Sequence, residues 1–525
     1  MNAAHTGMGD ELTVGKVGLH VARTRPGKLA VYDDRRRLTY GELDRQVQAL
    51  AGSLVAEGVA KGGIVCAYLP NCIDYIVLVL AVARAGAVFS PLNPRFKAYE
   101  IAKLLAKARP AMVFTTHDRV ATVMEALGTP DRDGPPPRIV SIDGGDAPPA
   151  PAVGIGRLRP PAPSLPAVAE TDLFSLMFTS GTTGHPKGAL AAHRARMIWV
   201  VNAAIQYGLN EDDVYLGTMP QVHSAGLTFT LIHLYIGATV RVMEHFDPDA
   251  YLEIVERERI TSSLTVPTML NMILEARRHS ARRHDLGSLR CVLTCGSPLP
   301  LSTKQQVLNE ISDRLYDYYG STESNSMSVL KPRDQLRKPA SVGQPFVNVE
   351  FTIAGPDGQA LPAGETGEIW CANPSVMDRY LGSEADTAAA FSGRWYRTGD
   401  LGYLDEEGFL YIVGRSKDMF VSGGVNVYPA EIEQVIMLHP AVLDCAVIGV
   451  DDEKWGQVAK VFVTLRKGHG LTLEALQAHC RQYLADYKKP RYLQFMAEIP
   501  KNAGGKTIKA ALPAGIPETE KEAQQ

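Results

Sequence analysis

The segment whose residue types most directly suggest chemistry is rich in glycine and hydroxyl groups. It reads Thr179-Ser180-Gly181-Thr182-Thr183-Gly184-His185-Pro186-Lys187-Gly188 and follows an apolar run that predicts a strand. Glycines let the backbone approach a phosphate closely, hydroxyl and amide groups donate hydrogen bonds to its oxygens, and Lys187 supplies positive charge. A Walker loop has glycine directly before its lysine and serine or threonine after it, and this segment has neither. The sequence therefore predicts a phosphate-binding loop of another kind.

A second group of oxygen-bearing side chains lies at residues 316–323, which read Tyr-Asp-Tyr-Tyr-Gly-Ser-Thr-Glu. Its carboxylate, Glu323, follows hydroxyl residues on a predicted loop. Magnesium is a hard cation that prefers oxygen ligands and usually bridges nucleotide phosphates. This segment is therefore a candidate metal site.

These segments resemble, in the same order, the motifs of the adenylate-forming superfamily, which contains acyl- and aryl-CoA synthetases, adenylation domains of peptide synthetases and firefly-type luciferases. The resemblance extends to residues 395–402, 408–418 and 500–506 and so covers nearly the whole chain. It implies that Glu323, with Thr179, holds Mg²⁺, and that Asp400 contacts the ribose of ATP. The residues that it implies for ATP binding are Thr179, Ser180, Gly181, Thr182, Thr183, Gly184, Lys187, Gly296, Ser297, Pro298, Asp317, Tyr318, Tyr319, Gly320, Ser321, Thr322, Asp400, Ile412, Arg415 and Lys506.

The resemblance also implies a catalytic set. Lys506 follows two glycines near the end of the chain, and the family's lysine at this place lies between the substrate carboxylate and the α-phosphate. His223 matches the family's gate between the carboxylate and thiol sites. The implied catalytic residues are Lys506, Thr322, Glu323, His223 and Lys187.

The residues expected to line an acyl pocket are mostly small or apolar: His223, Ala225, Gly226, Phe229, Val266, Thr268, Cys295, Gly296, Tyr318 and Ser326. Because no arginine or lysine stands among them, the sequence predicts a carboxylic acid whose body carries no charge.

The expected path for CoA comprises Ser422, Gly423, Gly424, Trp455, Tyr487 and Lys489. Its two glycines lack β-carbons and would leave room for the slim pantetheine arm. Lys417 stands two residues after Arg415, where the family has its hinge.

The resemblance implies an ATP-dependent acyl- or aryl-CoA ligase that uses ATP, Mg²⁺ and CoA. The substrate carboxylate attacks the α-phosphorus of ATP, pyrophosphate leaves, and the CoA thiol then displaces AMP. One alternative is a stand-alone adenylation enzyme that loads a carrier protein, which differs only in the acceptor. The other is a catalytically inactive nucleotide-binding protein, which the complete set of motif residues argues against.

Composition limits the other classes of protein. The chain of 525 residues is 45% hydrophobic and 21% charged, which is typical of globular proteins and excludes a disordered or fibrous one. Its 54 basic and 57 acidic residues nearly cancel, which argues against general nucleic-acid binding and a polybasic membrane anchor. The longest apolar run, residues 75–90, contains Arg84 and is shorter than the ~20 residues that a membrane-spanning helix needs. We expect a cytoplasmic monomer or homodimer whose partners are a small carboxylic acid and CoA.

Alternating strand and helix patterns predict βαβ units and an α/β fold that is mixed α+β in parts. Residues 64–69 and 87–89 are expected to be strands, with a core helix within residues 75–90. The body, residues 1–416, would combine βαβ layers with a β-rich subdomain, and residues 417–525 would form a small mobile α/β lid. A Pro- and Ala-rich segment near residues 128–169 is expected to be a mobile surface connector with one short strand at 138–142.

Overall fold

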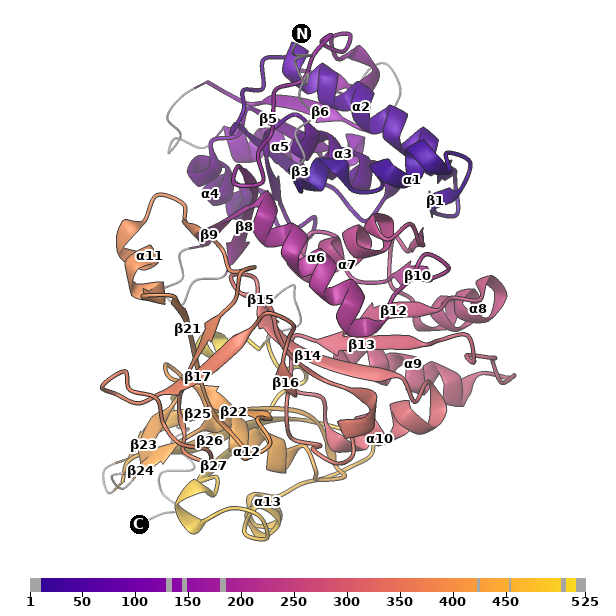
Figure 1. Cartoon of the computed structure of the whole chain (residues 1–525). Coiled ribbons are helices and arrows are strands. Elements are labelled where there is room, and N and C mark those ends of the chain that lie inside the picture. The colour runs from indigo at the N-terminus through magenta and orange to yellow at the C-terminus, as the bar shows by residue number, and fades with distance from the viewer. Residues whose placement is uncertain are drawn as a thin grey trace.

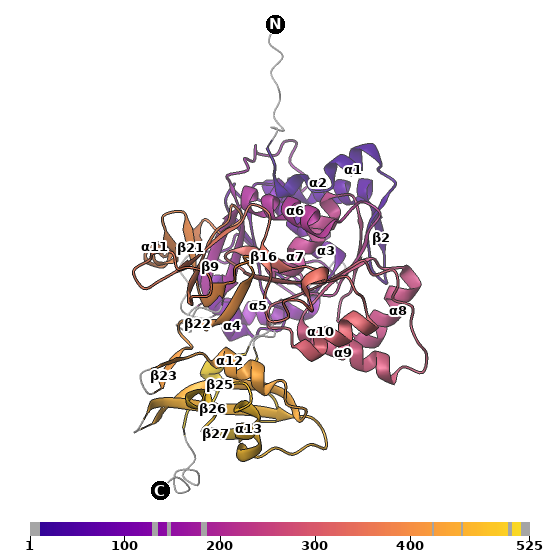
Figure 2. The same cartoon turned by 60° about the horizontal axis from the view of Figure 1, so that its bottom comes forward.

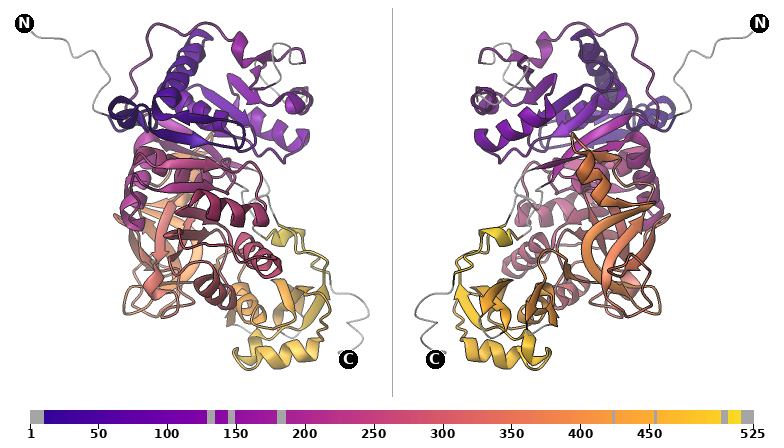
Figure 3. Two further views of the ribbon diagram at one scale, coloured as in Figure 1. Left: turned by 90° about the vertical axis from the view of Figure 1, so that its right-hand side faces the viewer. Right: turned by 90° about the vertical axis from the view of Figure 1, so that its left-hand side faces the viewer.

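The computed structural model of the chain describes residues 11–128, 135–143, 149–179, 186–422, 425–452, 455–501 and 507–515 (Figure 1). Within these ranges, three β-sheets with their helices build a large body, and a fourth sheet belongs to a smaller C-terminal unit. The smaller unit lies at one end of the molecule (Figure 2), opposite the indigo N-terminal elements in both views of Figure 3. The mixed α/β class that the sequence predicts is confirmed.

The first sheet of the body has eight strands; the six from β8 to β7 pair in parallel, and β9 and β19 pair antiparallel at the other edge. Their order is β19 (Arg379–Tyr380), β9 (Lys187–Ala192), β8 (Leu173–Thr179), β4 (Val88–Pro91), β3 (Ile64–Tyr68), β5 (Met112–Thr115), β6 (Arg138–Ser141) and β7 (Val153–Gly154). The helices of this half are α1 (Leu19–Thr24), α2 (Tyr40–Ala56), α3 (Ile73–Arg84), α4 (Ala98–Ala108) and α5 (Val120–Leu127).

The second sheet has nine strands. Their order is β16 (Gln344–Pro345), β15 (Asn325–Leu330), β14 (Leu315–Ser321), β13 (Cys291–Cys295), β12 (Ser262–Thr265), β10 (Val214–Gly217), β11 (Thr239–Val242), β1 (Leu29–Tyr32) and β2 (Arg37–Thr39). Its helices are α6 (His193–Tyr207), α7 (Ser224–Tyr235), α8 (Pro248–Glu258), α9 (Pro267–His279) and α10 (Leu301–Glu310).

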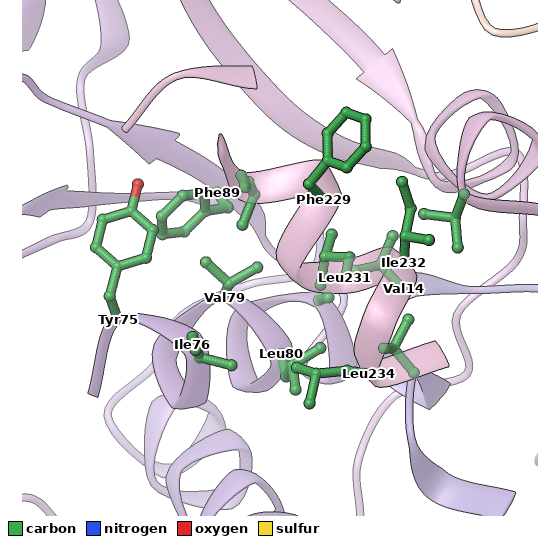
Figure 4. Close-up of a cluster of buried hydrophobic side chains, with 14 of the residues drawn as sticks. Val14, Tyr75, Ile76, Val79, Leu80, Phe89, Phe229, Leu231, Ile232 and Leu234 are labelled. Atoms are coloured by element: carbon green, nitrogen blue, oxygen red, sulfur yellow. The ribbon is translucent and has the colours of Figure 1, made fainter. Parts of the chain in front are cut away.

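The two large sheets share one apolar core. Helices α3 and α7 have buried side chains on nearly all sides, which is the pattern of a helix inside a core rather than at a surface. Figure 4 shows Val79 and Leu80 of α3 facing Leu231 and Leu234 of α7, with Phe89 of β4 beside them. This contact holds the two halves of the body in a fixed relation, so the ends of their strands meet at defined positions.

A smaller antiparallel sheet completes the body. It contains β17 (Glu350–Ala354), β18 (Gly367–Ala372), β20 (Phe391–Ser392), β21 (Trp395–Leu404) and β22 (Leu410–Arg415), with α11 (Glu384–Ala390) nearby. After a turn at residues 416–419, the C-terminal sheet follows with β23 (Phe420–Ser422), β24 (Val425–Val427), β25 (Val442–Asp452), β26 (Gly456–Leu465) and β27 (Tyr492–Phe495). Its helices are α12 (Pro429–Ile436) and α13 (Leu473–Cys480).

The helix and strand expected within residues 75–90 are confirmed, because α3 ends at Arg84 and β4 begins at Val88. The Pro- and Ala-rich segment differs from the sequence-based expectation. The described part of the Pro- and Ala-rich segment contributes β6 and β7 to the edge of the first sheet and packs closely against α2. There the Ala162 backbone N–H donates to the carbonyl oxygen of Gly52 at 3.0 Å, so this part is tied to the body. None of the helices in the described ranges is long and apolar enough to span a membrane.

Strands β14 and β15 approach each other closely at the start of the turn that connects them. A β-carbon on Gly320 would lie 2.0 Å from the carbonyl oxygen of Asn325, a distance that atoms cannot share. Asn325 itself has a φ of 57° and is buried. Only glycine at position 320 therefore allows the turn at residues 321–325 to close as it does.

We predict that Gly320→Ala lowers the free energy of unfolding by about 2 kcal/mol or more, because the added methyl group must push the two backbones apart. Thermal or denaturant unfolding measures the change. Gly27→Ala is the matched control, since a β-carbon at that exposed position meets no atom within 4 Å. Equal stability of both variants would contradict the steric argument.

Asp317 of β14 is buried, and burial raises the pKa of its carboxyl group to about 7, although the nearby Lys304 acts in the opposite direction. The folded protein therefore retains a proton that the unfolded chain releases above about pH 4. The contribution of Asp317 to stability therefore falls as the pH rises from about 4 to about 7.

We predict that Asp317→Asn raises the melting temperature relative to the wild-type protein, and that this advantage grows from pH 5 to pH 7 and then levels off. The asparagine amide has nearly the same shape as the aspartic acid side chain, but it does not ionise, so its effect on stability does not change with pH. Melting curves across this pH range check the effect, with Asp313→Asn, at an exposed position, as the control. A pH-independent difference would contradict the pKa assignment.

Candidate active site

Three segments from separate parts of the chain meet at the carboxylate of Glu323. The hydroxyl group of Thr179, at the end of β8, donates to Oε1 of Glu323 at 3.1 Å, and the hydroxyl of Tyr380 in β19 donates to the same oxygen at 3.2 Å. The backbone N–H of Met377 donates to the Glu323 carbonyl oxygen at 2.7 Å. The two residues expected to hold Mg²⁺, Thr179 and Glu323, are thus in direct contact. Tyr380 is a member of this cluster that sequence reasoning missed.

Lys187 begins β9 and lies next to this cluster. Its Nζ is 2.5 Å from Oδ1 of Asp386 in α11 and 5.2 Å from the centre of the Tyr380 ring. This ion pair lowers the pKa of the Asp386 carboxyl group. Asp386 is a second residue that sequence reasoning missed.

Asp400 is held between two strands and one neighbouring tyrosine. Asp400 in β21 pairs in register with Arg415 in β22, and Nε of Arg415 lies 2.9 Å from Oδ1 of Asp400. The hydroxyl group of Tyr319 donates to the other oxygen, Oδ2, at 2.5 Å. Burial and the Asp400 charge raise the pKa of Tyr319 well above its ordinary value, so the phenol remains a donor. The predicted ribose-binding pair therefore has a fixed orientation.

Other expected ATP residues that the structure describes follow β13, lie in the β14–β15 turn or belong to β22. Gly296, Ser297 and Pro298 directly follow β13 and are exposed, and Gly296 has a φ of 89°. Ser321 and Thr322 are half-buried in the β14–β15 turn, and Ile412 is half-buried in β22.

The expected acyl-pocket residues come mainly from α7 and its neighbours. His223 precedes α7, and Phe229 of α7 is buried with its ring 5.9 Å from that of Tyr318 in β14. Cys295 is buried beside Tyr318, and burial raises the pKa of its thiol to about 12. A β-carbon on Gly226 would lie 2.4 Å from the Pro220 carbonyl oxygen, so this position must be glycine. The other expected residues are Ala225 and Val266, both half-buried, Ser326, which is buried, and Thr268, which is exposed.

One charged residue adjoins this group and was not foreseen. Arg196 of α6 is buried, and its Nη1 donates to Oγ of Ser224 at 2.9 Å and to Oγ1 of Thr228 at 2.5 Å. Ser224 and Thr228 belong to α7, and Ser224 directly follows His223. The sequence-based statement that no arginine stands among the expected pocket residues therefore misses a cation immediately behind them.

The expected CoA path is only partly described. Ser422 is buried, Trp455 and Tyr487 are exposed, and Nζ of Lys489 lies 2.7 Å from Oδ1 of Asp486. Lys417 is exposed in the turn between β22 and β23, which joins the body to the C-terminal unit. The other predicted residues, Ser180, Gly181, Thr182, Thr183, Gly184, Gly423, Gly424 and Lys506, lie outside the described residues.

Comparisons with known proteins show the family to which the chain belongs. The family model of the AMP-binding enzymes matches residues 19–381, and that of the AMP-binding enzyme C-terminal domain matches residues 431–506. The 2-succinylbenzoate–CoA ligase of Geobacillus sp. strain WCH70 is 34% identical over 505 residues, which cover 94% of this chain and 96% of the relative. The feruloyl-CoA synthase of an Amycolatopsis species is 35% identical over 491 residues, covering 93% and 96%.

Solved structures of similar fold include the amide bond synthetase McbA from Marinactinospora thermotolerans, with a TM-score of 0.85, 29% identity and coverage of 95% of this chain and 98% of that one. The o-succinylbenzoate coenzyme A synthetase of Bacillus subtilis, in complex with ATP and magnesium ion, has a TM-score of 0.83 and 28% identity, covering 95% and 99%. Because the family models span most of the sequence and the relatives align over nearly all of it, this chain belongs to the AMP-binding enzymes, the adenylate-forming family that its motifs resemble.

Proposed function

We infer that this protein is an AMP-forming carboxylate–CoA ligase. It activates a carboxylic acid as an acyl adenylate, releases pyrophosphate, and transfers the acyl group to the thiol of CoA with release of AMP. The observation that carries this inference is the cluster of Glu323, Thr179 and Tyr380 beside Lys187. It is supported by relatives of about 35% identity that are CoA ligases and that align with this chain over nearly their full length.

The first step needs no nucleophile from the enzyme, since the substrate's own carboxylate attacks the α-phosphorus of ATP. The protein contributes positioning and stabilisation of the charge that develops on the phosphoryl oxygens. We assign this stabilisation to Lys187, Thr322 and Lys506.

The contacts of Asp400 support its role in holding the ribose. An ionised carboxylate offers about four lone-pair sites, and Tyr319 and Arg415 occupy one on each oxygen. No other described residue donates to this carboxylate, so its remaining sites can accept two adjacent hydroxyl groups, while the two protein contacts hold its orientation.

The donor set at Glu323 fits magnesium. One carboxylate with neighbouring hydroxyl oxygens suits a cation that uses one or two carboxylates and takes its other ligands from phosphates and water. Glu323 and Thr179 would hold the ion, which would supply charge neutralisation for the nucleotide phosphates when bound.

For the second step we propose that the C-terminal unit reorients about Lys417. Lys506 would serve adenylation, and Ser422, Gly423 and Gly424 would serve entry of the thiol. Trp455, Tyr487 and Lys489 would line the CoA path, and His223 would gate it. The exposed turn at residues 416–419 can absorb the φ and ψ changes that such a motion needs.

The test of this function is product analysis with purified protein, ATP, Mg²⁺, CoA and a panel of carboxylic acids. We predict that AMP, pyrophosphate and an acyl-CoA form in equal amounts, and that AMP release falls without CoA. Formation of ADP and phosphate would refute adenylation. Transfer of the acyl group from the adenylate to a carrier protein but not to CoA would refute the proposal that CoA is the acceptor.

We predict that Glu323→Gln reduces the rate of adenylation by ~10²-fold or more, because it keeps the size of the side chain but removes a preorganised charge. Pyrophosphate release at limiting Mg²⁺ measures the loss. Glu350→Gln, at an exposed site outside the cluster, is the matched control. A wild-type rate for Glu323→Gln at limiting Mg²⁺ would show that the metal is held elsewhere.

A further inference from the structure

Arg196 is a buried cation whose contacts with the described residues are all with neutral groups. Besides its hydrogen bonds to Ser224 and Thr228, Nη1 lies 3.4 Å from Oδ1 of Asn325, and the guanidinium carbon lies 5.3 Å from the centre of the Trp199 ring. The side chain is 1% exposed. Burial lowers the pKa of this guanidinium only to about 10, so it stays charged at neutral pH.

No carboxylate among the described residues pairs with this charge. All three hydrogen bonds use Nη1, and neither Nε nor Nη2 donates to any residue that the structure describes. Nε and Nη2 form the edge of a guanidinium that binds a carboxylate through two parallel hydrogen bonds. The protein thus holds a buried cation in place by one nitrogen and leaves its carboxylate-binding edge unused.

The position of Arg196 ties it to the acyl site. Its partners Ser224 and Asn325 are sequence neighbours of His223 and Ser326, which are both expected acyl-pocket residues. Trp199, one helical turn beyond Arg196, donates from Nε1 to Oγ of Ser326 at 2.9 Å. The guanidinium therefore stands where two stretches of the expected pocket wall meet.

A structural role alone does not account for a cation here. Hydroxyl and amide oxygens can be satisfied by one another or by a neutral donor, whereas a buried charge without a counter-ion is unfavourable for folding. An anion bound beside the guanidinium during function would offset this cost. Because its partners Ser224 and Asn325 adjoin expected acyl-pocket residues, the anion that suits this position is a carboxylate on the body of the substrate acid, in addition to the carboxylate that reacts at the α-phosphorus.

Resting on the function proposed above, we propose that Arg196 recognises a second carboxylate at the distal end of the substrate, so that the enzyme acts on dicarboxylic acids. This replaces the sequence-based expectation of an acid with an uncharged body. Arg196 is then a specificity-determining residue, and Ser224, Thr228 and Asn325 hold its guanidinium in position.

The test compares diacids with monoacids of matched length on the full-length protein. Succinate, adipate, suberate and terephthalate are paired with butanoate, hexanoate, octanoate and benzoate. We expect kcat/KM for pyrophosphate release to be ~10²-fold higher for the best diacid than for the monoacid of matched length. This ratio is typical of the affinity lost when one partner of a buried charge pair is removed. We expect Arg196→Met to abolish this preference by lowering the diacid value ~10²-fold without lowering the monoacid value.

Matched variants separate recognition from folding. Arg194→Met makes the same change at an exposed position on the same helix and should leave the preference intact. Arg196→Lys keeps the charge but cannot donate two parallel hydrogen bonds, so it should retain part of the preference for diacids. If Arg196→Met folds poorly, Arg196→Gln takes its place in the test.

Ligand-induced melting shifts provide a readout independent of catalysis. The preferred diacid should raise the melting temperature of the wild-type protein and not that of Arg196→Met. Wild-type preference for monoacids, or equal losses for both acids in Arg196→Met, would overturn the inference and leave the proposed function standing. Absence of AMP with every acid, together with an Arg196-dependent melting shift by a diacid, would refute the proposed function and support the binding site.

Discussion

The close approach of the β14 and β15 backbones at Gly320 is the constraint on which the site depends. The turn that follows carries Thr322 and Glu323, and its residues are tied to the segment before β19. The side-chain amide of Asn373 donates to the carbonyl oxygens of Ser324 and Ser326 at 2.7 and 3.2 Å. Since β19 pairs with β9 of the other large sheet, one turn fixes Glu323 relative to both Thr179 and Tyr380.

The charged groups of this site differ in whether a nearby protein group compensates their charge. Asp400 has Arg415, Lys187 has Asp386, and Glu323 accepts from two hydroxyl groups, so each is oriented before any ligand arrives. Arg196 lacks such a counter-charge among the described residues. The contrast follows from burial, because an exposed cation could rely on water, whereas one that is 1% exposed must rely on protein or on a ligand.

The sequence predicts a nucleotide site because the proposed phosphate loop and the β14–β15 turn are continuous segments whose residue types are typical of phosphate and metal binding. Tyr380 and Asp386 escape such reasoning, since they reach the cluster only through the pairing of β19 with β9, almost two hundred residues earlier in the chain. Arg196 escapes it for another reason. Arg194 and Arg196 stand two apart on one helix, and only tertiary packing decides that the first is exposed and the second buried.

Under the proposed function, the nucleotide phosphates would compete with Asp386 for the Lys187 cation. The side chains are 25% and 37% exposed, so solvent screens the pair, and such pairs contribute only about 0–1 kcal/mol. A triphosphate carries more negative charge than one carboxylate and would take over the lysine at little cost. Under the proposed function, Asp386 would hold Lys187 beside the Tyr380 ring, whose hydroxyl group donates to Glu323, so that the cation would be in place when phosphate binds.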